Sequence, residues 1–218
     1  MTLAIFDLDN TLLNGDSDHA WGQFLVDQGI VDGAAFAAAN DRFYQEYLAG
    51  TLDIHEFLEF ALAPLSQHSI AQLQDWHQQF MRDVIAPMRL QKADELIAKH
   101  RSQGHRLLII TATNRFVTEP IARALGINEL LATDPEIIDN RYTGRVKGTP
   151  CFQDGKVIRL NTWLKEHNET LDNSWFYSDS RNDLPLLELV ANPVAVDPDK
   201  VLTATAAERG WPIISLRD

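Results

Sequence analysis

The sequence is poor in cysteine and in long hydrophobic runs. Its 218 residues include a single cysteine, Cys151, so no internal disulfide can form, as is usual for proteins of reducing compartments. No apolar stretch approaches the ~18–20 residues that cross a bilayer. The first apolar run has no basic segment before it, unlike a signal peptide. We therefore expect a cytoplasmic protein that is not inserted in a membrane.

Basic residues are also scarce. The chain has 19 Lys and Arg against 31 Asp and Glu, a net charge of −12. Nucleic-acid binding needs a basic surface stripe, so we expect no nucleic-acid partner. The same charge repels phosphorylated metabolites unless a cation or local basic groups offset it at the binding site. Any phosphate chemistry in this protein should therefore need a bound cation.

Short apolar runs alternate with helical patterns along most of the chain. The runs typical of buried parallel strands cover residues 3–6, 106–111, 174–178, 193–196 and 212–216. The helical patterns between them cover residues 91–102, 114–125 and 156–166. This alternation is typical of an α/β fold with a doubly wound, mostly parallel, Rossmann-like sheet.

The region from residue 16 to residue 85 breaks this alternation. It shows helical periodicity without a convincing strand, and Gly29, Gly33, Gly50 and Pro64 interrupt it as helix ends and turns do. We therefore predict an inserted four-helix cap domain of residues 16–87 and an α/β core domain of residues 1–15 and 88–218. The alternative is a single merged α/β domain.

Polar residues stand where the predicted strands end. They are Asp7 and Asp9 after the first strand, Thr111 after the second, Asp179, Asn182 and Asp183 after the third, and Lys156 at the start of the preceding helix. Because the carboxyl ends of parallel strands meet at one edge of the sheet, we expect these side chains to lie together.

This set of residue types suits phosphoryl transfer from a monoester. A strand-end carboxylate can attack phosphorus and form an aspartyl-phosphate, while a second carboxylate serves as acid and then as base. Two carboxylates on neighbouring strand ends can hold Mg²⁺. A hydroxyl at a helix N-terminus and a lysine can bind the phosphoryl oxygens. The sequence therefore predicts a Mg²⁺-dependent phosphomonoester hydrolase.

Four motifs in order carry a family resemblance: DLDNTLL, IITAT, the lysine of GKVIRL, and SDSRNDLPLLE. Together they resemble the motifs of the haloacid dehalogenase superfamily over nearly the whole chain. A helical insert directly after the first motif resembles the subgroup that contains phosphoserine phosphatases. The resemblance implies that Asp7 is the nucleophile and that Asp9 is the acid and base.

The resemblance also implies the metal and phosphate ligands. Mg²⁺ would bind the Asp7 carboxylate, the Asp9 backbone carbonyl and the Asp179 carboxylate, with Asp183 as a further metal partner through water. Thr111, Ala112 and Asn182 would bind phosphate. Lys156 is preferred to Lys147 because its 23-residue distance from Asp179 suits the subgroup. Asp183 is also a candidate N-cap for a helix that begins at Leu184.

The predicted cap is acidic, which bears on the substrate. Between residues 16 and 85 there are eleven Asp and Glu residues, opposed only by Arg42 and Arg82. Phosphoserine phosphatases place an arginine in the cap for the substrate carboxylate, whereas the corresponding stretch here, GTLDIHEFLE, has Glu59 at that place. The Thr-Ala-Thr of the second motif and the SDSRND of the fourth also depart from those enzymes.

An acidic site favours a substrate with an amine and without a carboxylate. The stretches GDSDHAWGQF and ITATNRFVTEPIA resemble bacterial histidinol-phosphatases of the superfamily. We therefore expect histidinol phosphate as substrate, with its amine or imidazolium bound by Asp16, Asp18 or Glu59. The alternatives are a phosphoserine phosphatase or a broader small-metabolite phosphatase. A signalling receiver that keeps its phospho-aspartate belongs to another class, and Asp9 and the cap argue against it. We expect a monomer or a homodimer.

Overall fold

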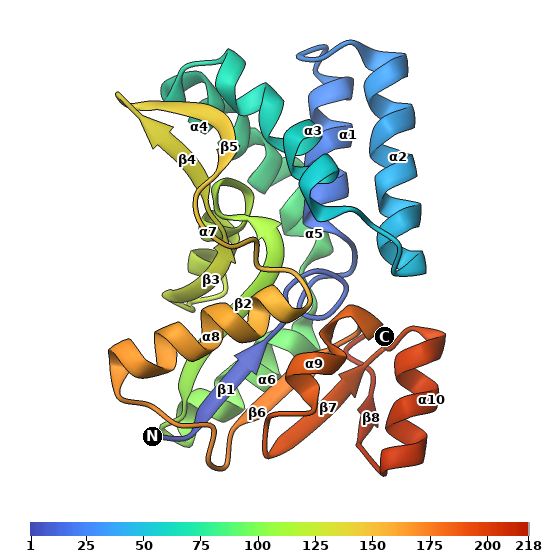
Figure 1. The fold of residues 1–218 in the computed structure, drawn as a ribbon, viewed down its shortest axis with the longest axis vertical. Coiled ribbons are helices and arrows are strands. Elements are labelled where there is room, and N and C mark those ends of the chain that lie inside the picture. Colours follow the sequence, from blue (N-terminus) through green and yellow to red (C-terminus); the bar gives the residue numbers. More distant parts are fainter. Residues whose placement is uncertain (218) are drawn as a thin grey trace.

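The computed structural model describes residues 1–217, and its centre is a parallel sheet of six strands (Figure 1). The strand order is β3-β2-β1-β6-β7-β8. The strands are β1 (Leu3–Phe6), β2 (Arg106–Asn114), β3 (Glu129–Thr133), β6 (Trp175–Ser178), β7 (Asn192–Val196) and β8 (Ile213–Ile214). All neighbouring pairs run parallel, which confirms the doubly wound α/β fold.

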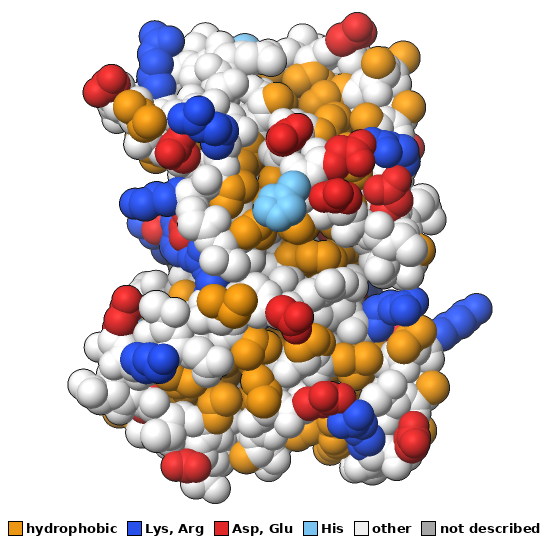
Figure 2. Space-filling model, viewed as in Figure 1, with side chains coloured by type: hydrophobic (Ala, Val, Ile, Leu, Met, Phe, Trp, Pro, Cys, Tyr) orange, Lys and Arg blue, Asp and Glu red, His pale blue; other side chains and the backbone are white. Residues whose placement is uncertain are grey.

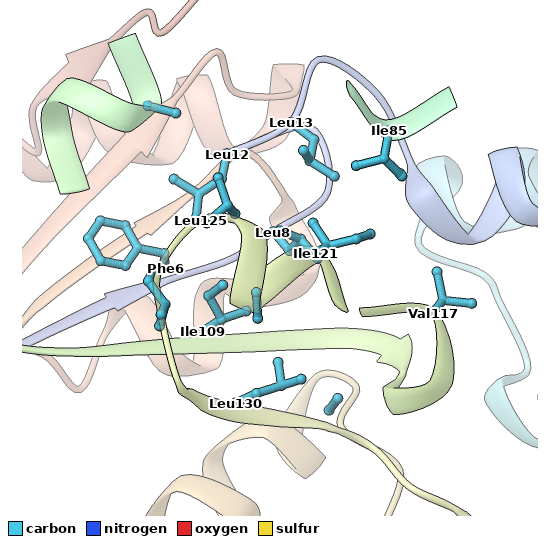
Figure 3. Packing of buried hydrophobic residues seen from close by; sticks show 14 of the residues in the cluster. Phe6, Leu8, Leu12, Leu13, Ile85, Ile109, Val117, Ile121, Leu125 and Leu130 are labelled. Carbon is cyan, nitrogen blue, oxygen red and sulfur yellow. The ribbon is translucent and has the colours of Figure 1, made fainter. Parts of the chain in front are cut away.

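Helices cover both faces of the sheet. They are α6 (Gln91–Ser102), α7 (Arg115–Ala124), α8 (Asp154–His167), α9 (Leu184–Leu187) and α10 (Lys200–Arg209), with a 3₁₀ turn at Arg181–Asp183 before α9. Successive strand residues point to opposite faces. Phe6 and Ile109 therefore pack on one side with α6 and α7, as Figure 3 shows in part. Ile5 and Leu108 pack on the other side with α8.

Four helices near the carboxyl edge of the sheet form the cap (Figure 1). They are α1 (Ser17–Asp27), α2 (Gly33–Ala49), α3 (Ile54–Gln67) and α4 (Ile70–Phe80). The chain leaves α4 through a π-helical turn at Met81–Ile85 and the short α5 (Ala86–Met88). Acidic side chains gather on the surface over α2 and α3 (Figure 2). In residues 1–217 no helix is long and apolar enough to cross a membrane.

Two features of the fold were not predicted. One is β3, whose apolar run is only three residues long and follows α7 after a short loop. The other is an antiparallel hairpin of β4 (Pro135–Ile138) and β5 (Arg141–Val146). Its turn residues Asp139 and Asn140 have φ of 49° and 59°, as tight hairpin turns require. The hairpin packs against α3, so a second chain segment joins the cap.

The cap and the sheet share apolar packing. Leu13 and Arg89 pair where the chain enters and leaves the cap, and Asn14 N donates to Met88 O at 2.8 Å. Trp21 of α1 and Phe80 of α4 belong to the same buried cluster as the sheet residues. The division into a core domain and a cap domain at residues 16–87 stays a prediction.

Candidate active site

The site begins where β1 ends. The last ladder bond runs from Asp7 N to Tyr177 O at 2.9 Å, and the chain then turns, with Asn10 at φ 56°. Asp7 and Asp9 follow the strand directly, and their residues are only 3% and 7% exposed. Both carboxyl groups are therefore held in a fixed, mostly dry position at the carboxyl edge of the sheet.

Lys156 lies between two of the predicted carboxylates. Its Nζ donates to Asp7 Oδ1 at 2.7 Å and to Asp183 Oδ2 at 2.8 Å, and the lysine is 2% exposed. Burial alone would lower the pKa of Lys156, but Asp183 and Asp7 outweigh it and raise the pKa. Lys147 is exposed on the loop after β5. The structure thus brings Lys156, and not Lys147, to the site.

A glycine allows this position of Lys156. A Cβ on Gly155 would lie 2.0 Å from Pro150 O, so only glycine fits at the first turn of α8. The close approach of the Pro150 backbone to this turn places the lysine that follows against the sheet edge.

Asp9 is oriented by donors from two other elements. Its Oδ1 accepts from Ser17 N at 2.6 Å, and its Oδ2 accepts from Thr113 Oγ1 at 2.8 Å. Thr111 Oγ1 lies 3.4 Å from Asp9 Oδ2. Burial and the nearby Asp16 carboxylate raise the pKa of Asp9 to about 6, although the Ser17 and Thr113 bonds oppose the shift. A carboxyl group with such a pKa can give and take a proton near neutral pH.

Asp179 lies beside Asp7 and is bound to the first motif. Thr11 Oγ1 donates to Asp179 Oδ1 at 3.0 Å and accepts from Asp179 N at 3.0 Å. Burial, Asp7 and Asp183 raise the pKa of Asp179 well above its ordinary value. Burial raises the pKa of Asp7 to about 7, with Asp183 and Asp9 adding to the shift and Lys156 opposing it.

These buried carboxylates fit a divalent cation. The single positive charge of Lys156 does not balance the negative charges of Asp7, Asp179 and Asp183. Carboxylate oxygens with such an excess of negative charge suit Mg²⁺. Among residues 1–217 no three His, Cys, Asp or Glu side chains converge as a metal cluster. The ligand set of the Asp7 and Asp179 carboxylates, the Asp9 main-chain carbonyl and water stays a prediction.

Asp183 and Asn182 make contacts that were not predicted. Asp183 is the N-cap residue of α9, as predicted, but its side chain makes no capping bond, and its Oδ2 accepts from Ser178 Oγ at 2.7 Å. Asn182 Nδ2 donates to Tyr47 O at 3.1 Å, and its Oδ1 accepts from Gln153 Nε2 at 3.2 Å. The structure places Asn182 between core and cap and outside the pocket lining.

A pocket of about 40 Å³ lies over Asp7 and Asp9. Its floor also contains Thr111, Ala112 and Thr113, and its walls come from the start of α1, from α2 and from the start of α3. The wall residues are Asp16, Asp18, His19, Asn40, Phe43, Tyr44, Tyr47, Leu52, Ile54 and Phe57.

The three acidic residues predicted to bind substrate occupy different places. Asp16 faces the pocket, but its Oδ1 accepts from Asp18 N and His19 N at 2.9 and 2.8 Å as the N-cap of α1. Asp18 faces the pocket, with Asn114 Nδ2 at 3.4 Å from its Oδ1. Glu59 is exposed and lines a separate depression beside β5, because its side of α3 faces away from α1. The structure does not bring Glu59 to the pocket.

Several residues of the site were not predicted. Thr11 and Thr113 stand inside the first and second motifs, so their spacing could have indicated them. Ser17 acts through its backbone N–H, and the aromatic wall of α2 consists of residues that a helical pattern presents equally as core. Neither leaves a signal in the sequence.

Comparison with known proteins agrees with this geometry. The haloacid dehalogenase-like hydrolase family matches residues 4–188. A histidinol-phosphatase of Neisseria meningitidis is 47% identical over 99% of both chains. The phosphoserine phosphatase SerB1 of Mycobacterium tuberculosis is 32% identical over 98% of this chain and 70% of that protein.

Two solved structures show the same fold. A Bordetella pertussis protein of unknown function has a TM-score of 0.93 at 46% identity and covers 99% of this chain and 100% of that one. A phospho-aspartyl intermediate analogue of phosphoserine phosphatase has a TM-score of 0.71 at 17% identity, over 99% of this chain and 93% of that one. The chain is a member of the haloacid dehalogenase-like hydrolase family.

Proposed function

We propose that this enzyme is a Mg²⁺-dependent phosphomonoester hydrolase whose substrate is histidinol phosphate. The proposal rests on the composition of the pocket over Asp7. Asp16 and Asp18 carry acidic groups into it, and aromatic rings of α2 and α3 form its wall. Its lining, which lies wholly in the described part of the chain, includes no Lys or Arg. Such a pocket favours a cationic, ring-bearing leaving group without a carboxylate.

The chemistry follows from the floor of the pocket. A carboxylate oxygen of Asp7 attacks phosphorus, the bond from phosphorus to the leaving oxygen breaks, and Asp9 gives its proton to that oxygen. Asp9 then takes a proton from water as the water oxygen attacks the aspartyl-phosphate. Inorganic phosphate leaves, and the Asp7 carboxylate is restored.

The neighbouring side chains position these groups. Lys156 holds one oxygen of Asp7, so the other is directed at the substrate. Mg²⁺, when held by Asp7 and Asp179, supplies positive charge to the phosphoryl oxygens. Thr111 lies on the pocket floor beside Asp9 and is our candidate donor to a phosphoryl oxygen, together with the backbone at Ala112.

Asp18 is the better candidate for the substrate cation. The Asp16 carboxylate already accepts two backbone N–H groups of α1, whereas Asp18 has one long contact to Asn114. The histidinol-phosphatase with 47% identity over the full chain supports the same substrate. Phosphoserine carries a carboxylate that no cationic side chain of this pocket would bind.

The test is phosphate release from histidinol phosphate and from phosphoserine, measured side by side with Mg²⁺ and with EDTA. We expect a preference for histidinol phosphate that EDTA and Asp7→Asn abolish. In Asp18→Asn the ratio of the two kcat/KM values should move toward phosphoserine by about ten-fold or more. Glu59→Gln, a matched loss of one cap charge outside the pocket, should leave the ratio unchanged. Preference of the native enzyme for phosphoserine would overturn the substrate assignment.

A further inference from the structure

The C-terminal end of α2 lies on the loop that follows β6. Arg181 Nη1 donates to Ala49 O at 3.2 Å, and Asn182 Nδ2 donates to Tyr47 O at 3.1 Å. The last carbonyls of a helix lack intrahelical donors, and α2 has no basic residue in its last turn. The loop therefore supplies the donors and the positive charge that favour this helix end.

The contact depends on a glycine of the cap. Gly50, at φ 73°, ends α2, and a Cβ there would lie 3.0 Å from Arg181 Nε and 3.2 Å from Cζ. The Arg181 guanidinium therefore packs directly on the backbone of Gly50. A Cβ at position 50 would require the guanidinium to shift.

The loop under this helix end is part of the catalytic centre. Asp179 precedes it, and Arg181 N donates to Asp199 Oδ2 at 2.7 Å, which fixes the loop backbone. The side chains of Tyr44 and Tyr47 on α2 reach Asn10 and Ser180 of the two catalytic loops. Helix α2 thus contacts the loops that hold the candidate nucleophile and metal ligands.

The contact lies next to the pocket over Asp7. Phe43, Tyr44 and Tyr47 of α2 form part of the pocket wall. The position of α2 therefore sets the shape of the space that the leaving group of the ester occupies.

We propose that Arg181 is a positioning residue that holds α2 in place as a wall beside the bound ester. It acts through this wall and takes no part in the chemical steps. The inference rests on the proposed phosphatase activity but not on the identity of the ester, because any leaving group that touches α2 would depend on the position of this helix.

The first test compares Arg181→Ala with the native enzyme on histidinol phosphate and on acetyl phosphate, whose small leaving group does not need the wall. We expect kcat/KM for histidinol phosphate to fall about ten-fold, mainly through KM, because one charged hydrogen bond is lost. For acetyl phosphate it should change less than two-fold. Arg181→Lys should restore part of the loss. Equal losses on both substrates, or no loss, would overturn the proposal.

A second measurement does not need turnover. Hydrogen exchange at the amides of Gly50 and Thr51, which bond to Tyr47 O and Glu46 O, should become about ten-fold faster in Arg181→Ala. Arg209→Ala removes another partly exposed arginine, paired with Glu188, and should leave this exchange unchanged. Unchanged exchange in Arg181→Ala would overturn the proposal. A native enzyme that cleaves neither substrate would overturn the proposed function alone, and exchange would still decide the role of Arg181.

Discussion

Lys156 Nζ lies 2.7 Å from Asp7 Oδ1, although 149 positions of sequence separate the two residues. The same ammonium group contacts both oxygens of Asp183, at 2.7 and 2.8 Å. All three residues are at most 3% exposed. One buried cation thus holds two buried carboxylates, and removing it leaves both without a counter-charge.

We expect Lys156→Met to be inactive and to unfold more easily. Leaving two buried carboxylates without their cation should lower the free energy of unfolding by about 3 kcal/mol at pH 7.5. The deficit should shrink at pH 5, where Asp7 takes up a proton. Urea unfolding at both pH values measures it. Lys147→Met, at an exposed lysine, is the control, and equal stability of the two variants would contradict this assignment.

We expect Thr113→Val to slow catalysis without loosening the fold. The change keeps the side-chain volume but removes the hydroxyl that donates to Asp9 Oδ2 at 2.8 Å. The acid then loses its orientation, and kcat should fall about 10- to 100-fold. Steady-state kinetics of phosphate release measures the effect. Thr113→Ser should stay near the native rate, as should Thr162→Val on the exposed face of α8. A native kcat in Thr113→Val would rule out this role.

Mg²⁺ should stabilise the native enzyme by binding beside Asp179. A ligand at 100 times its Kd stabilises a protein by about 2.7 kcal/mol, which appears as a rise in Tm of several degrees by differential scanning calorimetry. In Asp179→Asn this rise should shrink or disappear, because the variant loses a negatively charged oxygen ligand. The same rise in both proteins would place the cation elsewhere.

Acid should destabilise the protein through His100. Burial, with His105 and Lys99 adding to it, lowers the pKa of His100 to about 4. Its Nε2 lies 2.7 Å from the Tyr177 hydroxyl. The unfolded chain binds a proton near pH 6.5 and the folded chain only near pH 4, so this residue's contribution is complete above pH 6.5 and is lost as pH falls. Between pH 7.5 and 5 the loss amounts to about 2 kcal/mol.

The comparison of native protein with His100→Gln isolates this contribution. Asp7 and Asp9 have raised pKa values and act in the opposite direction, but they are present in both proteins. Urea unfolding at pH 7.5 and 5 should show a shallower loss of stability in His100→Gln, whereas His55→Gln, at an exposed histidine, should follow the native protein. Identical slopes in native protein and His100→Gln would refute the assignment.

Much of the sheet and of the site floor could be predicted from local sequence patterns. The apolar run of β1 and the two carboxylates after it predicted a strand end with a reactive group, and the structure has the strand end with both carboxylates buried beside it. The parallel sheet was also predictable, because apolar runs that alternate with helices have few other ways to bury both faces. Thr111 and Asp179 then had to lie near Asp7, since strand ends of one sheet share an edge.

The cap was predictable only as a set of helices. Helical periodicity shows which faces are apolar but not which neighbour each face meets, because many pairings bury similar areas. From the sequence, Glu59 and Asp18 are therefore equal candidates for binding the substrate. In the structure, Glu59 lies on a different surface, away from the pocket over Asp7. The β4–β5 hairpin was missed because its strands are half-exposed and gain their burial from α3.

The sequence by itself determined the sheet, the order of its motifs and the residue types of the floor of the site, since these follow from local patterns and from the shared edge of parallel strands. Only the tertiary structure decided which groups meet across long distances. It placed Lys156 between Asp7 and Asp183, directed Asn182 and Arg181 to the end of α2, and formed an acidic, aromatic pocket over the floor. Such contacts depend on how helix faces pack in three dimensions, which residue spacing along the chain does not encode.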